Sequence, residues 1–157
     1  MIKEPSFTIG IEEEYKLVDR TSRNLINQMP ERMLAECQRR LGNQVSPEYL
    51  QCQIEVGTKI CTSLGEARSD LNLLRKTVGE VAAEHGLAII ASSTHPFGSP
   101  GDLEHTPRER YNQLADDLQE VVRRLVISGM HIHVGIEDDD LRTDLMGQVS
   151  YILPHLL

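Results

Sequence analysis

Three segments of the chain alternate between apolar and polar residues, and this alternation constrains the fold more than any other feature of the sequence. Residues 7–18, 48–58 and 130–136 each place apolar side chains at nearly every second position. A period of two is typical of a β-strand that buries one face and leaves the other polar. Because strands of a doubly wound parallel sheet are apolar on both faces, the pattern favours an antiparallel sheet.

Helical patterns separate these strands. Ser63 with Glu66, and Thr106 with Glu109, form capping boxes of the kind that start helices. The helices that we expect span residues 30–42, 63–86, from 106 onward, and from 141 to the end, with a short buried strand at 87–92. We therefore predict an α+β fold, in which helices cover one face of a largely antiparallel sheet and the other face stays polar and open.

The composition excludes several classes of protein. The 157 residues are about one domain's worth and include 16 Lys and Arg against 24 Asp and Glu, a net charge of −8. Nucleic-acid and anionic-membrane surfaces need clustered positive charge, so we expect neither partner. No apolar run approaches the roughly 20 residues of a membrane span, and residues 1–10 do not resemble a secretory signal. Three cysteines without a pairing pattern indicate a reduced, cytoplasmic protein with buried thiols.

The polar faces of the three alternating strands carry the chemistry. Glu12 and Glu14 project from the same face of the first strand, Glu55 from the polar face of the second, and His131 and His133 from that of the third. Carboxylates on one surface repel each other unless basic residues or a cation lie between them. Mg²⁺ prefers oxygen ligands, so the pattern indicates a divalent-cation site.

Each of these signals also has an ordinary explanation. Paired glutamates on a strand are often solvated surface, and the two histidines are equally compatible with a structural pair. The acidic run 137–140 is interpreted as a helix cap on solvated surface and excluded from the site. Lys16 is the one basic residue expected on the polar face within the first two strands, and Glu13 interrupts an apolar face without a reason visible in the sequence.

Four blocks of sequence carry a resemblance to a known family. They are GIEEEYKLVD (10–19), QCQIEVGT (51–58), ASSTHPF (91–97) and SGMHIHVG (128–135). In this order and spacing they resemble the type 2 glutamate–cysteine ligase family, also called carboxylate–amine ligases. The blocks further resemble distant versions of glutamine synthetase motifs, in which three strands line one metal-bound ATP site. The resemblance implies a glutamine synthetase-like α+β fold.

The resemblance also implies roles for individual residues. Glu12 and Glu14 correspond to metal ligands of an E-x-E strand, and Glu55 to the Glu of a Gln-x-Glu strand. His131 corresponds to the first His of G-M-H-x-H, near metal and nucleotide phosphate, and His133 to the second, close to the nucleotide. The resemblance thus implies ATP and Mg²⁺ as cofactors. The glycine-rich phosphate loops GxxxxGKS/T and GxGxxG are absent from the sequence, so any nucleotide must be held by metals and side chains.

Some residues of the four blocks are harder to place. Glu48 corresponds to a further metal ligand upstream of Glu55. Seven residues along one regular strand would put the two on opposite faces, so the strand must bulge or bend between them. Thr94, His95 and Arg110 lie in or near family-like blocks, and we assign them no role.

The implied activity is ATP-dependent amide formation. A carboxylate, the γ-carboxylate of glutamate or a similar substrate, is activated as an acyl phosphate and joined to an amine such as that of cysteine. Neutralisation of phosphate charge by Mg²⁺ would dominate catalysis. Nothing in these residues defines a pocket for the thiol of cysteine.

The resemblance covers residues 1–157 as the N-terminal portion of a single catalytic domain, truncated within the helix after the GMHIHVG strand, because family members are more than twice as long. The open edges of such a portion favour association, including a homo-oligomer. Two alternatives stay open: a non-catalytic module that binds metal or nucleotide, and a protein that binds Fe or Zn through its histidines and a glutamate.

Overall fold

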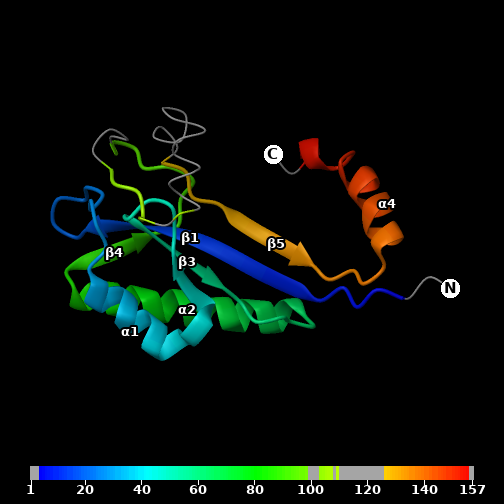
Figure 1. Cartoon of the computed structure of the whole chain (residues 1–157), viewed down its shortest axis with the longest axis horizontal. Helices are drawn as coiled ribbons and strands as arrows, with labels where there is room; N and C mark the ends of the chain where they lie inside the picture. Colours follow the sequence, from blue (N-terminus) through cyan, green and yellow to red (C-terminus); the bar gives the residue numbers. More distant parts are fainter. Residues whose placement is uncertain (1–3, 99–102, 108, 110–125, 156–157) are drawn as a thin grey trace.

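The longest strand, β1 (Ile9–Asp19), lies at the centre of the sheet in the computed structural model (Figure 1). β3 (Gln53–Gly57) pairs with one edge of β1, while β4 (Leu87–Ile90) and β5 (Met130–Val134) follow one another along its other edge. β2 (Val45–Pro47) continues the sheet beyond β3. Every pairing between these strands is antiparallel, which confirms the predicted sheet.

The structure describes residues 4–98, 103–107, 109 and 126–155. Within them the helices are α1 (Glu31–Leu41), α2 (Leu64–Glu84) and α4 (Asp139–Val149), with short 3-10 turns at Gly42–Gln44 and Leu153–His155. The helix predicted from Thr106 onward falls mainly on residues 110–125, outside this description, and so does Arg110. No helix of the described residues has the length and apolar character of a membrane span.

α1 and α2 cover one face of the sheet, and the core lies between them and the strands (Figure 1). Ile11, Tyr15 and Leu17 of β1 and Ile54 and Val56 of β3 enter or border this core, as the alternation predicts. The thiols are also buried as predicted. Core residues from both layers include Tyr15, Leu17, Ile54, Val56, Met33, Cys37, Leu74, Val78 and Val81.

Local side chains begin two of the helices. The Ser63 hydroxyl accepts a hydrogen bond from the N–H of Glu66 (3.2 Å) at the start of α2, which confirms that capping prediction. Asp138 caps α4 through the N–H of Leu141 (2.9 Å), so the acidic run does act as a helix cap. The prediction that this helix runs to the end of the chain is wrong, because α4 ends at Val149 and a 3-10 turn containing Pro154 follows.

The segment predicted as one strand, residues 48–58, is correct only in its second half. β2 and β3 run antiparallel, with Pro47 opposite Ile54, and the chain reverses between them. Pro47 has no N–H to donate and ends β2, while the N–H of Gln53 donates to the carbonyl of Leu50 (2.9 Å) within the turn. Glu48 therefore lies in the reversal and not on β3.

Glu13 is the carboxylate that interrupts the apolar face of β1, and it forms an ion pair beneath the sheet. Its side chain is buried, and Arg75 of α2 donates two hydrogen bonds to it, one of them 2.7 Å long. The Tyr15 hydroxyl donates a third. Burial opposes ionisation of Glu13, but the hydrogen bonds from Arg75 and Tyr15 outweigh it and hold the pKa of this carboxyl below its usual value.

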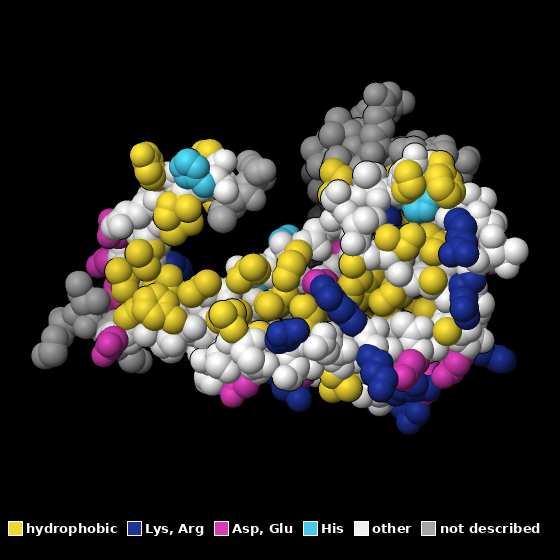
Figure 2. All heavy atoms as spheres, turned by 180° about the vertical axis from the view of Figure 1, so that it is seen from behind, with side chains coloured by type: hydrophobic (Ala, Val, Ile, Leu, Met, Phe, Trp, Pro, Cys, Tyr) yellow, Lys and Arg dark blue, Asp and Glu magenta, His cyan; other side chains and the backbone are white. Residues whose placement is uncertain are grey.

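The helix-side face of β5 has no cover among the described residues. Its apolar side chains lie opposite the odd-numbered residues of β1, and thus point to the side that α1 and α2 cover elsewhere. They stay more than half exposed: Met130 51%, Ile132 64% and Val134 52%. α4 projects away from the sheet and buries none of its residues. Figure 2 shows hydrophobic side chains along α4 and across the neighbouring part of the sheet.

Replacing Arg75 with Met tests the ion pair beneath β1. The change leaves the buried Glu13 carboxylate without its cation, and we expect the free energy of unfolding to fall by about 2–3 kcal/mol. This is less than for a fully buried pair, because the Arg75 side chain is 46% exposed. Urea unfolding measures the loss. Arg68→Met, on the exposed side of α2, is the control, and equal effects of the two changes would contradict the prediction.

Candidate functional site

Antiparallel register gathers five of the predicted site residues on the face of the sheet opposite α1 and α2. We call this the acidic face, and it carries Glu12, Glu14, Glu55, His131 and His133. Glu14 lies directly opposite Glu55 on β3, and Glu12 lies directly opposite His131 on β5. Directly opposed residues of an antiparallel pair project from the same face. His133, two residues further along β5, shares that face. Residues more than 100 positions apart in the chain therefore meet on one surface.

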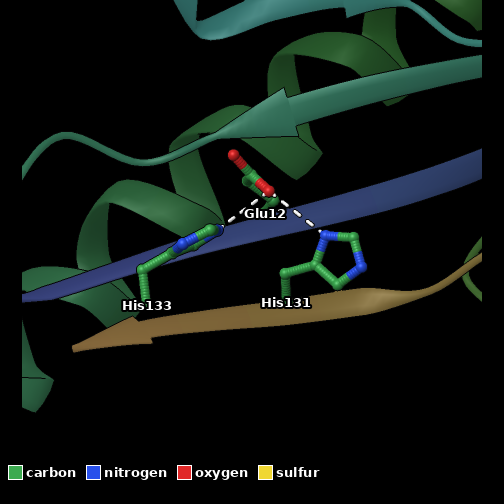
Figure 3. Close-up of side chains that lie close together, drawn as sticks. All are labelled: Glu12, His131 and His133. Carbon is green, nitrogen blue, oxygen red and sulfur yellow. Dashed lines mark hydrogen bonds and ion pairs between the residues drawn. The ribbon is translucent and has the colours of Figure 1, made fainter. Parts of the chain in front are cut away.

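Glu12 lies between the two histidines (Figure 3). Oε2 of Glu12 is 2.9 Å from Nε2 of His133 and 3.2 Å from Nδ1 of His131. The hydrogen bond with His133 lowers the pKa of Glu12; a smaller desolvation effect opposes this, and His131 adds to the lowering. One ligand atom from each of the three side chains lies within 4.8 Å of the others, a spacing that suits a shared metal ion.

Glu14 is fixed by the start of β5. Its Oε2 accepts a hydrogen bond from the N–H of Gly129 (2.9 Å), and its own N–H donates to the Gly129 carbonyl (3.2 Å). A Cβ at residue 129 would lie 3.7 Å from Nε2 of His131 and 3.9 Å from Oε1 of Glu14. Both distances are ordinary van der Waals contacts, so a Cβ at this position would fit against both side chains.

Glu55 faces other carboxylates. Burial raises the pKa of Glu55, and the neighbouring charges of Glu48 and then Glu12 raise it further, while a hydrogen bond from the Ser46 hydroxyl (3.3 Å) partly offsets this. Glu48 reaches Glu55 because the chain reverses between β2 and β3. The bend or bulge predicted between Glu48 and Glu55 is thus a complete reversal of the chain between β2 and β3.

No Lys or Arg forms an ion pair with Glu12, Glu14 or Glu55 within the part of the chain that the structure describes. A divalent cation would stabilise carboxylates that share one face without a Lys or Arg between them, and it would relieve the charges of Glu48 and Glu12 that help to raise the pKa of Glu55. Glu12, Glu14, Glu55 and Glu48 are therefore candidate metal ligands, with His131 and His133 beside them.

Lys16 and Gln53 lie on the same side of the sheet as Glu14 and Glu55, and the sequence did not reveal their role. Lys16 is on the face that the alternation indicated, but it is fully buried there and not exposed on the surface. Burial lowers the pKa of its ammonium group, and the charges of Cys52 and Glu14 partly offset this. The donors of Lys16 are directed to the carbonyls of Ser92 and Ser93 and to the Ser128 hydroxyl.

A hollow of about 320 Å³ opens where β4 ends and β5 begins. Both strands follow the same edge of β1, and the gap between them exposes a short stretch of that edge. The lining combines acidic, basic and hydroxyl groups from four segments: Glu13, Glu14, Arg75, Ala91, Ser92, Ser93, Ser128, Gly129 and Met130. A small polar ligand placed there would lie directly beside Glu14.

Thr94 and His95, which the sequence left without a role, stabilise the loop after β4. The Ser92 hydroxyl donates to the Thr94 carbonyl (2.7 Å), which tightens the loop. His95 is buried, with Nε2 3.1 Å from the carbonyl of Arg23, and its ring packs edge-on against Phe97. Neither Thr94 nor His95 contacts the acidic face in the contacts recorded for the described residues.

Two solved structures share this fold. A glutamate–cysteine ligase from Francisella tularensis, determined in complex with AMP, matches with a TM-score of 0.65 at 18% identity, over 95% of this chain and 30% of that chain. A bifunctional glutathione synthetase from Pasteurella multocida matches with a TM-score of 0.66 at 18% identity, over 89% of this chain and 18% of that chain. These similarities define the class of fold: the chain shares the α+β sheet of these two enzymes.

The chain belongs to the glutamate–cysteine ligase family 2, whose sequence model matches residues 8–157. Two relatives carry the provisional name glutamate–cysteine ligase 2. That of Rhodospirillum rubrum is 59% identical over 160 residues and that of Jannaschia sp. 53% over 151 residues. The alignments cover 99% and 96% of this chain but 41% and 40% of the relatives. The chain thus spans about two-fifths of the length of the curated relatives it matches.

Replacing Glu55 with Gln tests the repulsion between carboxylates on the acidic face. Without divalent cations, the change removes a charge that faces Glu48 and Glu12, and we expect the melting temperature to rise by roughly 2–4 °C if the repulsion is worth about 1 kcal/mol. Scanning calorimetry in EDTA measures this shift. Glu80→Gln, on the exposed side of α2, should leave the melting temperature nearly unchanged. A fall in that temperature for Glu55→Gln would contradict the prediction.

Proposed function

We propose that the chain supplies the acidic face of an ATP-dependent ligase that joins the γ-carboxylate of glutamate, or of a similar substrate, to an amine such as that of cysteine. The main support is the convergence of Glu12, Glu14 and Glu55 on one face, without a Lys or Arg partner among the described residues. Membership of the glutamate–cysteine ligase family 2 supports the same class of reaction. The AMP bound to the F. tularensis ligase supports a nucleotide site on this fold.

The donor set fits a hard divalent cation. Mg²⁺ prefers carboxylate oxygens, and a cation would relieve the negative charges of Glu48 and Glu12, which together with the larger effect of burial raise the pKa of Glu55. Glu12, Glu14 and Glu55 would hold the ion, with Glu48 as a further ligand. When bound, Mg²⁺ would supply neutralisation of the ATP phosphates. His131 and His133, at the β5 side of the face, would contact phosphate and nucleotide.

The proposed reaction consists of two displacements. An oxygen of the substrate carboxylate attacks the γ-phosphorus of ATP, the bond to the bridging oxygen breaks, and ADP leaves an acyl phosphate behind. The amine nitrogen then attacks the acyl carbon, inorganic phosphate leaves and the nitrogen gives up a proton. In both displacements negative groups approach each other, so this face must orient them and limit their repulsion.

A chimera tests the proposed function. This chain would replace the matching 160-residue stretch of the R. rubrum relative, and ADP release would be measured with glutamate and a panel of amines. We expect release that requires glutamate, an amine and Mg²⁺, and we expect Glu12→Gln or Glu55→Gln to lower kcat/KM by roughly 100-fold or more. Asp140→Asn, on exposed α4, is the control. Unaltered rates in the two site variants would reject the assignment.

We also propose that the chain is one portion of a larger catalytic domain. Its relatives are about two and a half times as long, and the helix-side face of β5 lacks cover among the described residues. Burial of the Met130, Ile132 or Val134 side chain would stabilise the assembled domain by roughly 1.5–3 kcal/mol each at most. The remaining portion of the family's length has the size to cover this face.

The uncovered face predicts that the chain alone self-associates. Analytical ultracentrifugation should detect dimers or larger species at micromolar concentrations, because β5 offers both an apolar face and an edge that pairs with no other described strand. Ile132→Ser should shift the distribution toward monomer. The matched control is Leu73→Ser on α2, where the apolar side chain is 53% exposed. A chain that stays monomeric throughout would contradict this prediction.

A second candidate function rests on the cluster of Glu12, His131 and His133. Two imidazoles and one carboxylate form a ligand set that suits Fe or Zn better than Mg²⁺. Elemental analysis of the purified chain separates the two candidates. Stoichiometric Zn or Fe, lost in His131→Ala, would favour the transition-metal site over the ligase, whereas their absence together with Mg²⁺-dependent ADP release would favour the ligase.

A further inference from the structure

A buried polar cluster lies beside the acidic face, on the same side of the sheet, and joins four segments of the chain. Lys16 of β1 lies directly opposite Gln53 of β3, and both side chains are buried. Lys16 donates to the Ser128 hydroxyl (2.8 Å), and Gln53 donates to the same hydroxyl (2.8 Å) and to the Ile127 carbonyl (2.6 Å). The cluster thus holds residues 127–128 at the point where the chain enters β5.

The same ammonium group also holds the end of β4. Lys16 donates to the carbonyls of Ser92 (2.9 Å) and Ser93 (3.3 Å), and the N–H of Ser128 donates to the Ser93 carbonyl (2.9 Å). With these contacts all three ammonium hydrogens of Lys16 have acceptors within the protein. Lys16 is therefore unable to contact a ligand while it keeps these bonds, and any influence on the site must act through the segments that it holds.

The residues immediately after the cluster form the site. Gly129 donates its N–H to the Glu14 carboxylate, and His131 and His133 follow on the same strand beside Glu12. β5 has one neighbouring strand, β1, among the described elements, and it buries none of its residues. Side-chain packing therefore does little to fix the position of β5, so its position depends more on the hydrogen bonds at its first residues.

We propose that Lys16, acting through Ser128, is a positioning residue that fixes where β5 begins and so aligns its two histidines against β1. Gln53 supports the same hydroxyl from the neighbouring strand. The consequence for catalysis rests on the proposed function, whereas the alignment of β5 does not. Outer residues that orient metal- or phosphate-binding side chains affect affinity or activity by roughly 10–100-fold when replaced.

Hydrogen exchange of the 157-residue chain, followed by NMR, tests the alignment directly. In Ser128→Ala and in Lys16→Met we expect the Gly129 amide and the amides that pair β5 with β1 to lose protection by about tenfold or more. The amides that pair β1 with β3 should keep their protection. Ser128→Thr retains the hydroxyl and should restore the protection of β5, and Ser69→Ala on exposed α2 is the control.

Each outcome decides the proposal. A loss of protection spread evenly over all strands would show that the cluster stabilises the whole fold and would overturn a specific positioning role, as would unchanged protection of β5. If Lys16→Met does not fold, Ser128→Ala decides alone, because it removes a single oxygen.

The chimera with the R. rubrum relative separates this proposal from the proposed function. If it is active, Ser128→Ala should lower kcat by roughly 10–100-fold and Ser128→Thr should restore it. An unaltered kcat in Ser128→Ala would overturn the catalytic consequence. If the unsubstituted chimera is inactive, the proposed function fails, while the exchange measurements still decide whether Lys16 positions β5.

Discussion

The antiparallel register of β1, with β3 on one edge and β5 on the other, is the constraint on which both the core and the candidate site depend. Odd-numbered residues of β1 enter the core with α1 and α2, and even-numbered residues meet Glu55 and His131 on the opposite face. A slip of one residue would reverse the faces of β1. Tyr15 and Leu17 would then lose their cover, and Glu12 and Glu14 would point into the apolar core.

Two buried charges favour this register over its neighbours. Glu13 has its cation, Arg75, only on the helix side, and Lys16 has its three acceptors only on the other side. Removing an ion from water costs several kcal/mol unless charges or hydrogen bonds compensate. Any shift of β1 would leave both ions without partners at once. The charges therefore specify the alignment of the central strand, and the alignment positions the acidic face.

The sequence predicted the parts of the fold that depend on local pattern. A period of two identified β1, β3 and β5 and the polar face that they share, and serine and aspartate caps identified the starts of α2 and α4. Pairings between residues far apart in the chain could not be predicted from local pattern. Glu13 has no local reason for its position because its partner Arg75 is 62 residues away, and Lys16 resembled a surface residue because its acceptor Ser128 is 112 residues away.

The reversal before β3 was missed for a related reason. Leu50 and Gln51 fit the alternation by chance, and the pairing of Pro47 with Ile54 reveals that the chain turns there. For the same reason Glu48 could not be placed with Glu55 by counting along a strand. The candidate site residues were recognisable by type and motif, while their mutual distances were set by pairings between distant segments.

The exposure of the face determines how strongly it acts by itself. The side chains of Glu12, His131 and His133 are 38%, 61% and 60% exposed, so water screens the charges they carry. Electrostatic stabilisation of phosphoryl transfer is large only where water is excluded and dipoles are held in place. Under the proposed function, Lys16 and Ser128 position the strand that carries His131 and His133, and the rest of the proposed catalytic domain would have to exclude water from this face. We therefore expect the described face to bind cations weakly alone and strongly when covered.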